Sequence, residues 1–262
     1  MGGLGNMLFQ IAATKSFAIS KNTKPSFYNL DEQLNYLNND KIYNPTLDYS
    51  EEYLRLNIFN NLLSDSPIDT KRYEFPFHYE DIEMEGDNIL VHGFFQSEKY
   101  FKKHEKEIKE DFKPTNEILN VINEKYSDIL KYRKTSIHVR RGDYVRHPNH
   151  HPIQPVEYYE NAINLLKNIT EKYIVFSDDI EWCKKTFIGD KFIFIEDEKD
   201  YIELYLMSMC ENNIICNSSF SWWGAWLNNY ENKIVIGPKL WFGNSLSFHN
   251  ISDIIPDTWI KI

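Results

Sequence analysis

The chain has 262 residues, of which 42% are hydrophobic and 26% charged, a composition that suits a folded protein and excludes a disordered one. Its 39 acidic and 29 basic residues give a net charge of −10. The field of the whole molecule therefore repels nucleic acids and anionic lipids, and any bound anion needs a local basic site.

No apolar run approaches the length of a membrane span. Three cysteines without a C-x-x-C spacing argue against a disulfide framework or structural zinc. With no N-terminal signal pattern, we expect a cytoplasmic protein that neither spans a membrane nor binds nucleic acid.

The first half of the chain predicts few regular elements. The expected elements are a glycine turn at 2–6 leading into a helix at 7–19, a helix at 50–63 within an irregular region 25–75, a strand at 88–94, a solvated charged helix at 98–112 and a helix at 115–130.

From residue 135 the chain alternates between short apolar segments and amphipathic ones. The expected strands are 136–140, 173–176, 192–195, 213–216 and 233–236, and the expected helices are 156–167, 179–187, 201–210 and 221–229. Strands that alternate with helices of this length indicate βαβ units and a parallel sheet. We therefore place a doubly wound, Rossmann-like domain at residues 133–262.

Polar residues follow the first of these strands, and parallel α/β sheets bind ligands at the carboxyl ends of their strands. Because side chains alternate along a strand, His138 and Arg140 share one face. A guanidinium fork matches the geometry of phosphate oxygens, so Arg140 is a candidate phosphate ligand. The alternative is a structural ion pair in which Arg140 or Arg141 binds Asp143 and holds a turn.

Other strand ends allow two interpretations each. The hydroxyls of Ser219 and Ser221 precede a predicted helix, where they could bind an anion or simply cap the helix. Asp178 and Asp179 could hold a metal ion, as in metal-dependent sugar transferases, or cap the helix that follows.

A histidine cluster lies in a loop that contains prolines. It consists of His147, His150 and His151. Its spacing lacks the helical pattern of metalloprotease sites, so a metal is the less favoured interpretation.

Four motifs together resemble the α-1,2-fucosyltransferase family, glycosyltransferase family 11. They are the segments 2–6, 138–144, 176–179 and 217–227. The resemblance implies a GT-B-like α/β fold of two halves, with an acceptor-side domain at 1–132 and a GDP-fucose-binding domain at 133–262. It also implies inverting transfer of L-fucose from GDP-β-L-fucose to the 2-hydroxyl of a terminal galactose on a glycan, without a metal or other cofactor.

The resemblance also implies roles for individual residues. Arg140 matches the arginine that grips the donor's β-phosphate, Arg141 supports that site and His138 contacts the nucleoside. Related enzymes carry an aspartate that reads the guanine amino edge, and Glu203 stands at the matching position. The complete set of implied donor-binding residues is Gly3, Gly5, Asn6, His138, Arg140, Arg141, Asp178, Glu203, Ser219 and Ser221.

For catalysis we expect Arg140 to stabilise the charge that builds on the leaving diphosphate. Asp143 is the best-placed general base, and His147, His150 and Glu157 are its rivals. Two alternative functions stay open: a catalytically weak nucleotide-sugar- or glycan-binding relative, and a metal-dependent transferase of GT-A type whose activity EDTA would abolish.

Overall fold

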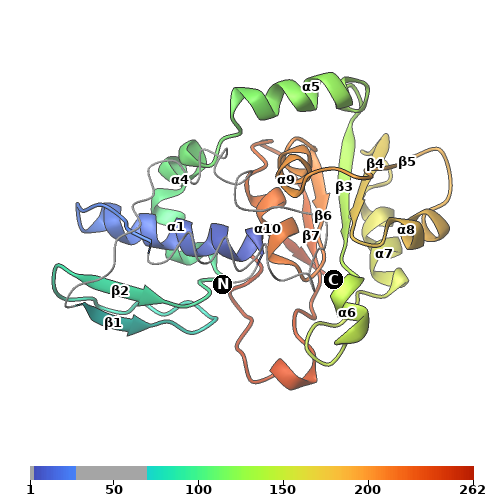
Figure 1. Ribbon diagram of the computed structural model, residues 1–262. Helices are drawn as coiled ribbons and strands as arrows, with labels where there is room; N and C mark the ends of the chain where they lie inside the picture. The colour runs from blue at the N-terminus through green and yellow to red at the C-terminus, as the bar shows by residue number, and fades with distance from the viewer. Residues whose placement is uncertain (1–2, 28–69) are drawn as a thin grey trace. The chain divides into compact units, whose positions relative to one another are not determined.

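The computed structural model describes residues 3–27 and 70–262 (Figure 1). The chain forms two compact units, Met1–Thr115 with His249–Pro256 and Asn116–Phe248 with Asp257–Ile262. The helix expected at 50–63 lies outside the described residues.

This division differs from the domain boundary expected between residues 132 and 133. Helix α5 (Asn116–Leu130) belongs to the second unit. The largely buried carboxylate of Glu198 ties α5 to this unit. It accepts hydrogen bonds from the Tyr126 hydroxyl at 2.7 Å and the Lys125 ammonium at 2.9 Å, both on α5.

The first unit combines a long helix with a small sheet. Its described elements are α1 (Leu4–Ser20), β1 (Lys71–Glu74), β2 (Ile89–His92), the 3-10 turns η2 (Glu98–Tyr100) and η3 (Lys102–His104), and α4 (Glu105–Asp111). Strands β1 and β2 pair in parallel. Their neighbours include an aromatic cluster in which Phe75 packs against Phe17, Phe95 and Tyr100, with ring centroids 5.1–5.7 Å apart.

The solvated helix expected at 98–112 is wrong in two respects. The segment forms two 3-10 turns before the short α4 begins. In addition, Phe101, Ile108 and Phe112 are fully buried, so the segment contributes a face to the core of its unit as well as charges to the surface.

The second unit contains a six-stranded parallel sheet, with strand order β5-β4-β3-β6-β7-β8. Its further elements are β3 (Lys134–Val139), α6 (Gly142–Arg146), α7 (Val156–Leu166), β4 (Lys172–Ser177), α8 (Ile180–Thr186), β5 (Phe192–Phe194), α9 (Asp200–Ser208), β6 (Asn212–Ile214), α10 (Ser219–Trp226), β7 (Val235–Gly237), η4 (Asn244–Leu246) and β8 (Ile260–Lys261). The expected α/β class and Rossmann-like parallel sheet are confirmed, whereas α6 and β8 were not foreseen.

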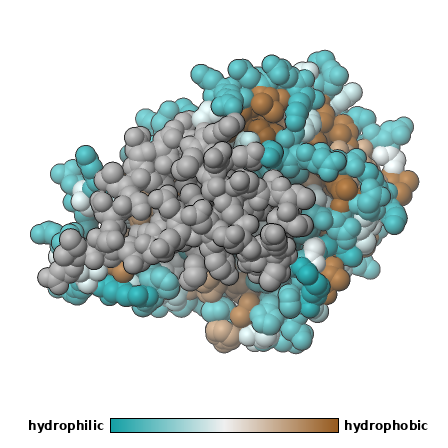
Figure 2. Space-filling model, viewed as in Figure 1, coloured by the Kyte–Doolittle hydropathy of each residue, from teal (hydrophilic) through white to brown (hydrophobic). Residues whose placement is uncertain are grey.

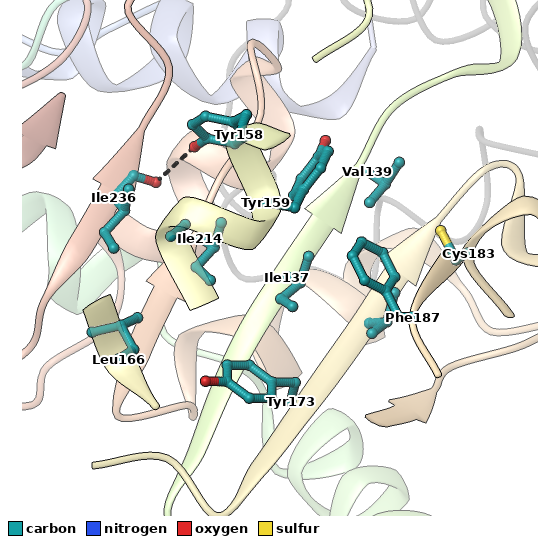
Figure 3. Close-up of a cluster of buried hydrophobic side chains, with 12 residues drawn as sticks. Ile137, Val139, Tyr158, Tyr159, Leu166, Tyr173, Cys183, Phe187, Ile214 and Ile236 are labelled. Atoms are coloured by element: carbon teal, nitrogen blue, oxygen red, sulfur yellow. Dashed lines mark hydrogen bonds between the residues drawn. The ribbon is translucent and has the colours of Figure 1, made fainter. Parts of the chain in front are cut away.

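Alternation along β3 directs successive side chains to opposite faces of this sheet. Ile137 and Val139 point into an apolar core formed with α7 and α8, where the Tyr158 hydroxyl donates to the Ile236 carbonyl (Figure 3). On the other face, Ser136 accepts a hydrogen bond from Asn213, whose amide also donates to the Met207 carbonyl in α9. Burying each large apolar side chain of this core contributes roughly 1.5–3 kcal/mol.

The visible surface of the described residues is mainly hydrophilic, with separate hydrophobic areas between the polar ones (Figure 2). None of the described helices has both the length and the apolar character needed to cross a bilayer.

Candidate functional site

The order of the sheet places a topological switch point between β3 and β6. From β3 the chain moves outward to β4 and β5, and it then returns to the other side of β3 as β6. Open α/β sheets bind ligands in the crevice at such a point, beyond the carboxyl ends of the strands. The segment that starts at Arg140 follows β3, and the segment that starts at Ile215 follows β6.

Arg140 is held by two carboxylates at this edge of the sheet. Its Nε lies 3.0 Å from Asp143 Oδ1 and 3.1 Å from Asp178 Oδ2, and its Nη2 lies 2.7 Å from Asp143 Oδ1. Burial lowers the pKa of Arg140, but the two carboxylates outweigh this effect and raise it above its ordinary value. The Arg140 side chain as a whole is 28% exposed, so it is only partly covered by the protein.

Arg141 is fixed differently from its neighbour. Its Nε donates to Asp179 Oδ2 at 2.9 Å, and its guanidinium lies 4.2 Å from the ring centroid of Trp182. Asp179 also caps α8, because its Oδ1 accepts from the backbone N–H of Trp182. The capping interpretation of this carboxylate is therefore confirmed.

Asp178 contacts both arginines of the motif. Besides Arg140, its Oδ1 accepts from the backbone N–H of Arg141 at 2.8 Å. It also lies against Gly142, where an added Cβ would stand 2.5 Å from Asp178 Oδ2. Only a glycine leaves room for this carboxylate against the start of α6.

His138 is buried near the carboxyl end of β3, with 5% of its surface exposed. Its Nδ1 lies 3.2 Å from Cys216 Sγ, and its ring is 5.5 Å from that of Phe220. Burial, with a smaller contribution from the charge of Arg140, lowers the pKa of His138 to about 3. The imidazole is thus neutral at physiological pH.

The two serines after β6 occupy different environments. Ser219 is half-buried at the first position of α10, whereas Ser221 is fully buried and donates to the Ser218 carbonyl at 3.3 Å. The Ser221 hydroxyl is therefore directed into the protein and not into a crevice. The residue that caps α10 is Ser218, which makes no side-chain capping bond.

Asn217 ties three loops together at the same edge. Its side-chain amide donates to the carbonyls of Pro152 and Trp241, both at 3.0 Å, and its Oδ1 accepts from Gln154 at 2.9 Å. Its carbonyl accepts from the Tyr144 hydroxyl at 2.9 Å. This asparagine is a structural centre for the loops of the site.

Glu203 lies in the first turn of α9. Burial is the main reason why the pKa of its carboxyl is raised well above its usual range, and the negative charges of Asp200, Glu198 and Asp178 add to it.

The remaining residues of the expected donor site belong to the first unit. Gly3 caps α1, and Gly5 and Asn6 lie within its first turn, so the expected turn at 2–6 is already helical from Leu4 onward. Asn6 Oδ1 accepts from Gln96 Nε2 at 2.8 Å.

The histidine cluster follows α6 and packs through one of its members. His151 stacks on Tyr144 with centroids 4.8 Å apart, and burial lowers its pKa. His147 and His150 are exposed, as is Glu157 in the first turn of α7. In the part of the chain that the structure describes, no group of three or more histidine, cysteine or acidic side chains could hold a metal ion.

Three residues that shape the site had no role assigned from the sequence. Tyr144 lies with its ring 5.8 Å from the Arg140 guanidinium, Trp182 lies against Arg141, and Cys216 contacts His138. Tyr144 is the last residue of the motif 138–144, which was a usable signal. Trp182 lies in α8 and Cys216 just after β6, so only the fold brings them here.

Comparison with known proteins extends over the whole chain. Residues 6–262 match the model of "Glycosyl transferase family 11". The O-antigen biosynthesis glycosyltransferase WbnK of Escherichia coli is 31% identical, over all of this chain and 98% of that protein. An α-1,2-colitosyltransferase of Escherichia coli is 33% identical, over all of this chain and 96% of that protein. A galactoside 2-α-L-fucosyltransferase of Caenorhabditis elegans is 23% identical, over 99% of this chain and 77% of that protein. The chain is therefore a glycosyltransferase that belongs to family 11.

Proposed function

We propose that this glycosyltransferase moves L-fucose from GDP-β-L-fucose to the 2-hydroxyl of a terminal galactose on a glycan, with inversion at the anomeric carbon. The observation that carries the proposal is Arg140 at the switch point, whose guanidinium contacts two carboxylates and whose side chain is 28% exposed. The name of the Caenorhabditis elegans relative supports this choice of donor and acceptor.

The donor's diphosphate would bind to Arg140, supported by Arg141 and by the N-terminus of α10 at Ser219, where free backbone N–H groups favour an anion. Ser221 has no direct contact in this proposal, because its hydroxyl is buried and bound.

The nucleoside would contact His138 and Glu203. A neutral imidazole does not add repulsion toward Arg140, and a carboxylate at Glu203 can accept from both guanine N1–H and N2–H. The pKa of Glu203 is raised, so the carboxyl of the free protein can be protonated. Binding of guanine would favour the ionised carboxylate, and Glu203 would then release its proton to solvent.

In the transfer step, the bond between the fucose C1 and the β-phosphate oxygen breaks while the acceptor oxygen bonds to C1 from the opposite face. The electron pair of the breaking bond goes to the phosphate, where the fixed positive charge of Arg140 stabilises it. The acceptor hydroxyl loses its proton to a nearby carboxylate, and we propose Asp143 for this role. No step requires a metal or another cofactor.

A second donor deserves a direct test, because one relative is named as a colitosyltransferase. Colitose differs from L-fucose by the absence of the 3-hydroxyl. A site that hydrogen-bonds this hydroxyl would reject the deoxy sugar strongly, since its polar groups would be left unpaired.

The experiment is incubation with GDP-fucose or GDP-colitose and a β-galactoside such as lactose, with and without EDTA. GDP release and the linkage of the product are measured. An α-1,2-linked fucosyl product that forms in EDTA is the expected result. A colitosyl product alone would change the donor, GDP binding without transfer would favour a non-catalytic relative, and activity that EDTA abolishes would favour a metal-dependent enzyme.

A further inference from the structure

We propose that Asp178 is a positioning residue that sets the orientation of the Arg140 guanidinium, and that it makes no contact with the donor. This inference rests on the proposed function. Asp178 divides its two oxygens between two fixed partners, with Oδ2 at 3.1 Å from Arg140 Nε and Oδ1 at 2.8 Å from the backbone nitrogen of Arg141. Both partners lie in the same short connection between β3 and α6.

The contacts of Arg140 leave one edge of the fork for a ligand. Its Nε–H donates to Asp143 Oδ1, while Asp178 Oδ2 forms an ion pair at the same nitrogen and Asp143 Oδ1 forms a second one at Nη2. Among the described residues, none receives a hydrogen bond from Nη1 of this arginine. The carboxylates therefore hold the side of the guanidinium that includes Nε, and its Nη1 side stays available for phosphate oxygens.

The number of charges in the cluster indicates that Asp178 helps catalysis by orienting Arg140 and not by adding charge. Three aspartates, Asp143, Asp178 and Asp179, contact only two arginines. A carboxylate this close to Arg140 weakens the attraction of the site for an anionic diphosphate. An orientation that favours the charge of the transition state can outweigh this cost, because catalysis depends on donors that are already aimed.

Gly142 offers a way to move Asp178 without changing any charge. A Cβ at this position would stand 2.5 Å from Asp178 Oδ2 and 3.2 Å from its Cγ. No positive φ is found at Gly142, so alanine fits the backbone of α6 there. Gly142→Ala would therefore push the carboxylate away from Arg140.

The experiment compares Asp178→Asn, Gly142→Ala and the double variant with the natural protein. The amide oxygen of Asp178→Asn can keep the hydrogen bond from the Arg141 backbone N–H, but the variant loses the negative charge that pairs with Arg140. We expect kcat to fall about 10- to 100-fold in each single variant, whereas the Kd for GDP stays within about threefold or tightens. The double variant should lose little more than either single one, because both changes act on one contact.

Asp128→Asn is the matched control, since Asp128 pairs with Lys131 on the exposed side of α5. Calorimetric GDP binding and thermal unfolding are measured on all variants. An unchanged kcat in Asp178→Asn would overturn the proposal. So would a raised KM for GDP-fucose with kcat intact, which would make Asp178 a donor ligand, or loss of the acidic limb of the kcat–pH profile, which would make it the base. Absence of transfer in the natural protein would instead count against the proposed function.

Discussion

Replacing Arg140 with alanine tests the central element of the proposed site. The change removes the charge that faces the leaving diphosphate, and loss of one such fixed donor costs about 3–4 kcal/mol of transition-state stabilisation. At about 1.4 kcal/mol for each factor of ten, kcat should fall roughly 10²- to 10³-fold. The kcat of Arg140→Lys should lie between those of the natural protein and Arg140→Ala. An ammonium keeps the charge but cannot contact Asp143, Asp178 and a phosphate at once as a planar guanidinium does.

The same change leaves two carboxylates without their partner. The side chains of Asp143 and Asp178 are only 15% and 25% exposed, so Arg140→Ala should also lower the free energy of unfolding by about 1–3 kcal/mol. Initial rates of GDP release are compared with urea unfolding curves, and Arg146→Ala, an exposed arginine on α6, is the control. Turnover within threefold of the natural protein, in a variant shown to be folded, would refute the assignment of Arg140.

Three further predictions concern pH, the nucleotide and metals. The pKa of His138 is lowered to about 3 in the folded state, so only the unfolded state takes up its proton as the pH falls below about 6.5. The natural protein should therefore lose about 2 kcal/mol more stability than His138→Gln between pH 6.5 and 4.5 in urea unfolding, and equal losses would contradict the buried neutral imidazole. If Glu203 reads the guanine edge, Glu203→Gln should weaken GDP binding about tenfold but inosine diphosphate binding less, whereas an equal effect on both nucleotides would argue against this contact. Transfer should continue in EDTA, and activity that is lost and then restored by Mn²⁺ would show a metal requirement.

The parallel sheet was predictable because its signals are local. Strands β4, β5 and β7 are short, mainly apolar runs, and helices of suitable length separate the successive strands from β3 to β7. β8 has only two residues, Ile260 and Lys261, both exposed, so neither length nor hydrophobicity marks it. Its pairing with β7 depends on contacts that the tertiary structure supplies.

The candidate site was predictable at its centre but not at its margins. Arg140, Asp143 and Asp178 were all named from the sequence, and the structure joins them through the contacts of the Arg140 guanidinium. The burial of Ser221 was missed because the sequence treated it as equivalent to Ser219. Two residues along a helix correspond to a rotation of about 200°, so the two hydroxyls cannot share a face once α10 begins at Ser219. The partners Trp182 and Cys216 depend on the order of strands in the sheet, which no local pattern specifies.

The route of the chain at its C-terminal end has a practical consequence. Residues 249–256 belong to the first unit, where Asp253 accepts hydrogen bonds from the Tyr79 backbone and the Lys99 ammonium, and residues 257–262 return to the second unit and supply β8. A stop codon after Phe248 would therefore damage both units at once. Neither unit can be expressed as one uninterrupted stretch of the gene, so fragment studies of this enzyme would need circularly permuted or co-expressed pieces.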